Sequence, residues 1–265
     1  MRTLMWFRSD LRVNDNPALH EATRHANRGV VAVYTICPKQ WQAHDMAPVK
    51  ADFILRNLKE LSAALEKKNI ALRILNTATF DGVTPALSGL ACELNCDAIY
   101  FNREYEINER GRDLTVTAAL ETAGIEVRTF TDQCLFEPGE LRTGKQQFYK
   151  VYTPFKRAWQ RAFENDRKRG RPLAPPRKQV EMVSQPDEIP QAIDGFDALP
   201  DRSSLWSAGE AIARKKLAVF IRSRIKSYKD DRDRPAIDGT STLSPYLASG
   251  VISLRQCLAA AIDSS

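Results

Sequence analysis

The chain has 265 residues, 43% of them hydrophobic, and a formal net charge of +6 at pH 7. Its length suits one large domain or two smaller ones, because domains usually contain about 100–200 residues. The apolar runs are too short for a signal peptide or a membrane span, so we expect a cytoplasmic protein without a membrane partner. The five cysteines show no paired spacing and the three histidines form no metal-binding motif, which predicts reduced thiols and no metal site. The positive charge favours a polyanionic partner but is also common in proteins that bind none.

Five short strand-like runs alternate with segments of helical length. Such alternation predicts an α/β fold with a Rossmann-like five-stranded parallel sheet and helices on both faces. Between the second and third runs, apolar residues recur at helical spacing from Ile54 to Leu65, which predicts a helix packed on the sheet. Asn14, Asp15 or Asn16 is expected to cap a helix that begins at Pro17. The five runs are Thr3–Arg8, Val30–Ile36, Leu72–Asn76, Ala98–Asn102 and Glu126–Phe130.

The pattern predicts three segments along the chain. Residues 1–135 form the α/β domain, and residues 136–203, punctuated by prolines, form an interdomain connection that includes a helix. Residues 204–265 begin an all-α domain, because apolar residues return at helical spacing after Trp206. The segment Ser244–Ala261 is also expected to be helical. The third segment is too short to bury a core of its own, so the second domain looks incomplete.

The predicted sheet should bind a ligand in the loops beyond the carboxyl ends of its strands. The first of these loops, Arg8–Arg12, lacks the glycines of a dinucleotide-binding fingerprint, so side chains should contact whatever binds there. Beyond the fourth strand, Asn108 and Glu109 place an amide beside a carboxylate. That pair suits the N–H groups of a pterin ring, although by spacing alone it is more often the exposed start of a helix.

A turn rich in hydroxyl groups, Asp238–Pro245, lies directly before a predicted helix. Its glycine and the side chains of Thr240, Ser241 and Ser244 suit a phosphate group held at a helix N-terminus. The same residue types cap helices without any ligand, and spacing alone favours that alternative.

Several further polar residues have no motif around them. Upstream of the turn, Tyr228, Arg232 and Arg234 suit either a nucleotide or a DNA phosphate, or simply lie exposed in a loop. His44 follows the second strand and is isolated, which is typical of a loop or packing residue. The residues themselves leave these alternatives open.

Taken together, separated blocks of the chain resemble the photolyase and cryptochrome family, and in particular the bacterial cyclobutane pyrimidine dimer photolyases with a folate antenna. The resemblance spans nearly the whole chain and occurs in the same order along it. The blocks are Trp6–Leu19, Trp41–Met46, Tyr105–Arg110, Tyr149–Trp159 and Arg232–Gly250.

The resemblance implies roles for individual residues. His44, Asn108 and Glu109 match contacts to the antenna folate, and Arg232 matches a position implicated in DNA contact. Many relatives have arginine where this chain has Thr242, so the backbone N–H of that residue is a better expected phosphate partner than its side chain. The residues that match the FAD-binding segment are Tyr228, Thr240, Ser241, Thr242, Leu243 and Ser244.

The resemblance also implies an activity. Members of the family repair cyclobutane pyrimidine dimers in DNA by light-driven electron transfer from fully reduced FAD, with methenyltetrahydrofolate as the antenna. We expect a monomer that acts on dimer-containing DNA. No catalytic residue is expected within this chain, which should fold its first domain, bind FAD weakly and not repair DNA alone. The rival expectations are a cryptochrome-like blue-light photosensor and a folate-binding module without catalysis.

Overall fold

A parallel five-stranded sheet forms the centre of the first domain. The computed structural model describes residues 1–197 and 206–264. The strands are β1 (Thr3–Phe7), β2 (Val30–Ile36), β3 (Leu72–Asn76), β4 (Ala98–Asn102) and β5 (Glu126–Phe130), in the order β3-β2-β1-β4-β5. The predicted Rossmann-like α/β fold is therefore confirmed, except that Arg8 lies beyond the end of β1.

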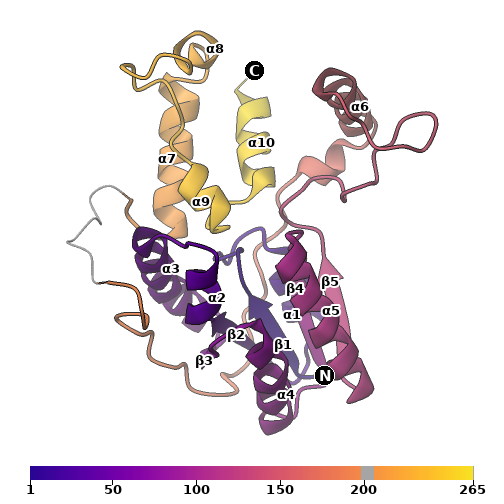
Figure 1. Ribbon diagram of the computed structural model, residues 1–265, viewed down its shortest axis with the longest axis vertical. Coiled ribbons are helices and arrows are strands. Elements are labelled where there is room, and N and C mark those ends of the chain that lie inside the picture. Colours follow the sequence, from indigo (N-terminus) through magenta and orange to yellow (C-terminus); the bar gives the residue numbers. More distant parts are fainter. Residues whose placement is uncertain (198–205, 265) are drawn as a thin grey trace.

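Successive residues of β1 point to opposite faces of the sheet and enter two separate cores, as the period of a strand requires. Met5 and Phe7 pack with residues of α1 (Pro17–His25) and α3 (Pro48–Glu66). Leu4 and Trp6 pack with α4 (Val83–Glu93) and lie in the same cluster as residues of α5 (Ile107–Thr122). The sheet is thus covered on both faces (Figure 1), so a ligand of this domain is expected beyond the carboxyl ends of its strands.

The helix caps follow the local sequence. Asn16 caps α1, since its side chain accepts a hydrogen bond from the backbone N–H of Leu19 at 3.1 Å and Pro17 occupies the first turn. Two short helices, α2 (Pro38–Ala43) and the 3₁₀ turn η1 (Phe80–Gly82), complete the domain. Within the described residues, no helix combines the length and hydropathy needed to cross a bilayer.

The connection carries α6 (Tyr152–Asn165) and the 3₁₀ turn η2 (Arg167–Gly170) and then returns along the sheet. Asp187 pairs with Arg73 of β3 and accepts from the backbone N–H of Ile74 at 2.8 Å, so the returning chain covers one edge of the sheet. The predicted boundary between residues 203 and 204 lies outside the described residues.

The last segment of the chain forms α7 (Glu210–Ser223), α8 (Tyr228–Asp231), α9 (Ser244–Ala248) and α10 (Leu254–Asp263). The prediction of one helical element over Ser244–Ala261 was wrong, because the chain turns sharply between α9 and α10. Gly250 has φ +62°, and a Cβ there would lie 2.1 Å from the carbonyl oxygen of Ser9. Only glycine permits so close an approach to the loop after β1.

This helical segment, residues 206–264, shares its core with the α/β domain. Tyr246 of α9 is fully buried, and its ring packs edge-on against Phe53 of α3 with centroids 5.4 Å apart. Leu217 of α7 and Ile252 belong to the same cluster of buried residues. A segment too short for its own core is thus stabilised by the core of its neighbour.

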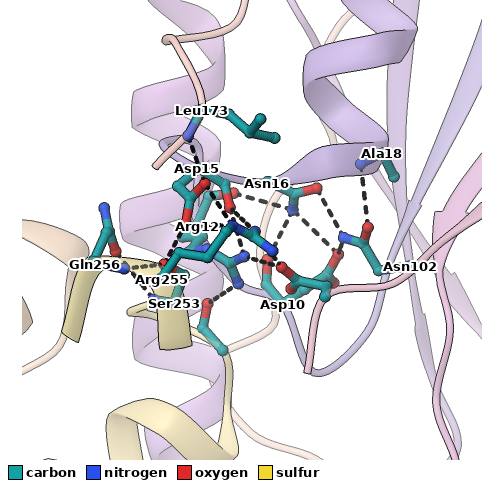
Figure 2. Close-up of polar contacts among 12 residues, drawn as sticks. Asp10, Arg12, Asp15, Asn16, Ala18, Asn102, Leu173, Ser253, Arg255 and Gln256 are labelled. Atoms are coloured by element: carbon teal, nitrogen blue, oxygen red, sulfur yellow. Dashed lines mark hydrogen bonds and ion pairs between the residues drawn. The ribbon is translucent and has the colours of Figure 1, made fainter. Parts of the chain in front are cut away.

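A cluster of buried ion pairs joins the α/β domain to the helical segment, and Figure 2 shows most of its members. Arg255 of α10 binds Asp15 through Nε at 2.9 Å and Asp132 through Nη2 at 2.8 Å, and Arg12 also pairs with Asp132. Burial opposes the charge of Arg12, but Asp132 together with Asp10 and Asp15 outweighs burial and raises the pKa of the guanidinium. The interdomain connection is also attached to this cluster, because the backbone N–H of Leu173 donates a hydrogen bond to Asp15. Three distant segments are therefore fixed to one another.

Replacing Asp15 with asparagine tests this cluster. Asp15 has φ +55°, which asparagine tolerates, so Asp15→Asn removes the charge with little backbone strain. We expect the free energy of unfolding to fall by about 3 kcal/mol, because Arg255 keeps a buried charge with one carboxylate fewer. Denaturant titration followed by circular dichroism measures the change.

Asp45→Asn is the matched control. Asp45 also has a positive φ, +52°, but its side chain is exposed and forms no ion pair with the described residues. An equal loss of stability in both variants would contradict the role given to the buried charges.

Candidate cofactor sites

The carboxyl edge of the sheet between β1 and β4 is filled by the protein's own side chains. Arg8 lies over the rings of Trp6 and Phe101, at 4.2 and 4.5 Å from their centroids. Glu104, 8% exposed, accepts from Arg112 at 2.7 Å. A ligand of this domain must therefore bind further out, beyond this layer of paired charges.

Burial and pairing have opposite effects on Glu104. Burial opposes its ionisation, but the positive charges of Arg8 and Arg112 outweigh burial and lower the pKa of the carboxyl below its ordinary value. Glu104 therefore remains ionised and keeps both guanidinium groups in place.

A cleft of about 640 Å³ lies between the edge of the sheet and the helical segment. That volume suits a small-molecule cofactor, since ligand pockets commonly measure about 300–1,000 Å³. Glu109 of α5 lines the cleft together with Ser9 and Lys50, while Ala248 and Leu254 line it from the helical segment. The cleft exists only because the α/β domain and the helical segment are held together.

The three predicted folate residues come from two neighbouring elements. Asn108 and Glu109 are in the first turn of α5, and His44 directly follows α2. The amide nitrogen of Asn108 lies 3.2 Å from Nε2 of His44, although the two residues are 64 positions apart. Glu109 lines the cleft, while His44 and Asn108 are exposed. Sequence reasoning missed Lys50, which belongs to no motif, and Glu106, which lies in the Tyr105–Arg110 block but was given no role; both line the same cleft.

A second cleft, of about 490 Å³, lies beside the hydroxyl-rich turn. Ser241 and Thr242 line one side of it, and Lys215 and Lys216 of α7 line another, with the ring of Trp206. Sequence reasoning gave these lysines no role in a site and so missed them. They add positive charge beside the hydroxyl groups, which favours an anion.

The turn does not cap the helix that follows it. Leu243, 3% exposed, is the N-cap residue of α9 and makes no side-chain cap. The hydroxyl groups of Thr240, Thr242 and Ser244 form no hydrogen bond with the described residues of the chain, and only Ser241 is engaged, by the backbone N–H of Leu243 at 3.4 Å. The alternative of a helix cap is therefore wrong for α9.

Thr242 has φ +51°, an uncommon conformation for a β-branched residue. Its backbone N–H was predicted to be a better phosphate partner than its side chain, and this stays a prediction.

Tyr228 and Arg232 lie together at the far end of the helical segment. The guanidinium of Arg232 is 5.9 Å from the centre of the Tyr228 ring, which packs edge-on against Phe220 of α7 at 5.6 Å. Phe220 also lines the second cleft. The Arg232 side chain is 51% exposed and lies 3.5 Å from the carboxylate of Asp233, and an extended anion outside the cleft can reach it. These two residues are in α8 and at its end, far from α5 and the sheet (Figure 1).

Comparison with known proteins identifies the family. The sequence model described as DNA photolyase matches residues 3–177, which is more than half of the chain. The chain belongs to the DNA photolyase family. The deoxyribodipyrimidine photo-lyase of Vibrio cholerae serotype O1 is 40% identical over 260 residues, covering 97% of this chain and 54% of that protein. The deoxyribodipyrimidine photo-lyase of Escherichia coli K12 is 34% identical over 255 residues, covering 96% and 53%.

Solved structures agree with this membership of the photolyase family. The class III photolyase of Agrobacterium tumefaciens has a TM-score of 0.78 and 31% identity, covering 98% of this chain and 52% of that one. The cryptochrome of Synechocystis sp. PCC6803 has a TM-score of 0.78 at 24% identity, which shows the shared fold. The chain spans about half the length of the curated photolyases that it matches.

Substituting Glu104 tests the charge layer beneath the first cleft. In Glu104→Gln, Arg8 and Arg112 lose a buried partner, and we expect the free energy of unfolding at pH 7 to fall by about 3 kcal/mol. The pKa of Glu104 is lowered on folding, so its stabilising effect is complete above the unfolded pKa and is lost as pH falls through the folded one.

The free energies of unfolding of the wild type and the variant should therefore differ at pH 7 and become equal under strongly acidic conditions. Urea titrations across that range measure the difference in unfolding free energy. A difference independent of pH would contradict the assignment to an ionised Glu104.

Proposed function

We propose that this chain belongs to a deoxyribodipyrimidine photo-lyase, which splits cyclobutane pyrimidine dimers in DNA with light, using FAD and a folate antenna. The observation that carries the proposal is the identity of 40% to a protein of that name across 97% of the chain. The two clefts support it, because each is lined by residues of a type suited to one of the two cofactors. We further propose that the protein is a cytoplasmic monomer.

The first cleft fits methenyltetrahydrofolate. The carboxylate of Glu109 would accept hydrogen bonds from the pterin ring, and His44 and Asn108, already in contact, would complete that side. Lys50 would pair with a carboxylate of the folate tail. The bound folate supplies absorption of near-ultraviolet light and passes on the excitation. The protein's role is to hold the ring in a fixed orientation between the α/β domain and the helical segment.

The second cleft fits the phosphate end of FAD. The hydroxyl groups of Thr240, Thr242 and Ser244, which form no hydrogen bond with the described part of the chain, would be available as donors. Ser241 and the backbone of Leu243 lie beside them, and Tyr228 packs against Phe220, which lines the cleft. Lys215 and Lys216 would offset the negative charge of the phosphates. The bound flavin, when fully reduced, supplies the electron for repair. The protein's role is to bind and orient this cofactor.

DNA contact is proposed for Arg232. Its exposed guanidinium, on a chain of net charge +6, would pair with a phosphate of the DNA backbone. We assign no catalytic residue and no residue of the dimer pocket to this chain, and we propose that the chain alone binds FAD weakly and does not repair DNA.

Folate binding can be measured with the chain as it stands. Mixed with methenyltetrahydrofolate, the purified chain should show the absorption band of the bound cofactor. Glu109→Gln should weaken binding by about 2 kcal/mol, or roughly thirtyfold, because hydrogen bonds to a charged partner contribute about that much. Glu121→Gln, at the exposed far end of the same helix, should bind like the wild type. Equal affinity in all three proteins would contradict the assignment of the folate to this cleft.

Repair is measured with this chain joined to the half of the Vibrio cholerae relative that it does not match. With reduced FAD and an oligonucleotide that contains one thymine dimer, blue light should restore the thymines and darkness should not. Arg232→Ala should weaken binding of the damaged DNA several-fold, by loss of one phosphate contact. Tight flavin binding with no repair in the light would favour a cryptochrome-like photosensor instead.

A further inference from the structure

Helix α2 is too short to fix its own position against the sheet. Of its six residues, all in the described part of the chain, only Pro38 is buried. Isolated helices need at least about 12 residues to be stable in water, so α2 depends on contacts with its neighbours. His44 follows this helix directly and is exposed. The position of His44 is therefore set by whatever holds α2.

The turn that contains His44 is folded onto Trp41. The carbonyl oxygen of Trp41 accepts hydrogen bonds from the backbone N–H of His44 at 3.2 Å and from that of Met46 at 3.0 Å. Asp45, between them, has φ +52°. Because of these bonds, a shift of Trp41 also moves His44 away from Asn108, whose amide nitrogen lies 3.2 Å from the imidazole ring.

The interdomain connection contacts α2 at two adjacent residues. The ring of Phe196 meets the ring of Trp41 edge-on, with centroids 6.2 Å apart. Beside it, the side-chain amide of Gln42 donates a hydrogen bond to the carbonyl oxygen of Gly195 at 3.1 Å. Ile193, 5% exposed, belongs to the cluster of buried residues around α3 and anchors this part of the connection. The contacts to α2 therefore come from a segment that is itself fixed to the core.

The connection and α2 approach each other very closely at Gly195. This residue has φ +77°, and a Cβ on it would lie 1.7 Å from the side-chain nitrogen of Gln42. The backbone conformation and the short distance both favour glycine. Any side chain at this position would displace the amide of Gln42 and break its hydrogen bond.

We propose that Gly195 and Phe196 are positioning residues for the antenna site, which hold His44 in place for the folate through α2. The inference rests on the folate site of the proposed function. The α/β domain supplies all three predicted folate residues, but the connection sets the position of one of them. Loosening α2 reduces the fraction of molecules in which the site is complete, and the apparent affinity for folate falls by that fraction.

Substitution of Gly195 tests the contact to Gln42. Gly195→Ala should weaken binding of methenyltetrahydrofolate about fivefold, because loss of one neutral hydrogen bond has an effect of that size. Gly124→Ala is the matched control, since Gly124 also has φ +77° and a Cβ on it would meet no described atom within 4 Å. Both variants carry the same backbone strain, so a difference between them reports the contact.

Two further variants show whether the effect passes through α2. Gly195→Ala should cause no additional loss in a chain that already carries Gln42→Ala, because the contact that it breaks is then absent. Phe196→Ala removes the partner of the Trp41 ring and should weaken folate binding by up to roughly tenfold, as expected for one aromatic pair. Titration of each purified chain, followed by the absorption band of the bound folate, measures these affinities.

The three histidines report on α2 in the absence of folate. Proton NMR should show a changed chemical shift for the His44 ring in both connection variants, Gly195→Ala and Phe196→Ala, and no change in the control. The signals of His20 and His25 should be unchanged in every variant. His20 is a sharp reference, because its ring also contacts the connection, at the carbonyl oxygen of Ala174 3.0 Å away. A change confined to His44 would thus report a displaced α2 and not a detached connection.

Weaker folate binding together with a changed His44 signal supports the proposal. An unchanged His44 signal in both connection variants overturns it, as does a control that behaves like Gly195→Ala. Wild-type affinity in both connection variants also overturns it. A wild type that shows no folate band refutes the proposed function. The His44 signals, measured without folate, then support or overturn the positioning on their own.

Discussion

Two arginines and two aspartates, all at least nine-tenths buried, connect the α/β domain to the helical segment. Arg12 and Asp15 come from the loop after β1, Asp132 from the loop after β5, and Arg255 from the first turn of α10. Removing such charges from water is costly, and only mutual pairing with good geometry offsets the cost. Loss of any one of these charges therefore destabilises the others, and it weakens the attachment of the helical segment.

Both the first cleft and its chemistry depend on that connection. Ser9 and Asp132 line the cleft from the α/β domain, and Ser253 and Leu254 line it from the helical segment, directly beside the ion pairs. The second cleft differs, because α7 and the hydroxyl-rich turn form it without the sheet. A folate and a flavin would thus be held by two structures that are linked but distinct. The excitation transfer of the proposed function would need a fixed geometry between the two clefts, and the buried charges hold the α/β domain and the helical segment together.

The sheet could be predicted from the sequence because its signals are local. Strand-like runs alternate with helical spacing, and Asn16 with Pro17 marks the start of α1. The break between α9 and α10 could not be predicted, since Gly250 is required by the approach of Ser9, which is 241 positions away. Similarly, His44 and Asn108 meet only in the folded chain, and only the family resemblance placed them together.

Charge was the least predictable property of the two sites. Lys215 and Lys216 have the spacing of solvated helix residues, yet they line the second cleft. Arg12, Asp15 and Asp132 are polar loop residues in the sequence and are almost fully buried in the structure. Local patterns do not reveal which charges a distant segment will cover.

The buried charges should join the α/β domain and the helical segment into a single cooperative unit. Native-state hydrogen exchange at increasing denaturant tests this directly, by comparing the amides of α10 with those of β1. We predict that both sets exchange through the same opening, with equal free energies and equal dependence on denaturant. The α10 amides could instead exchange through a separate opening whose free energy is lower by about 2 kcal/mol or more. That result would show that the helical segment is only loosely attached, and it would contradict the role given to the buried charges.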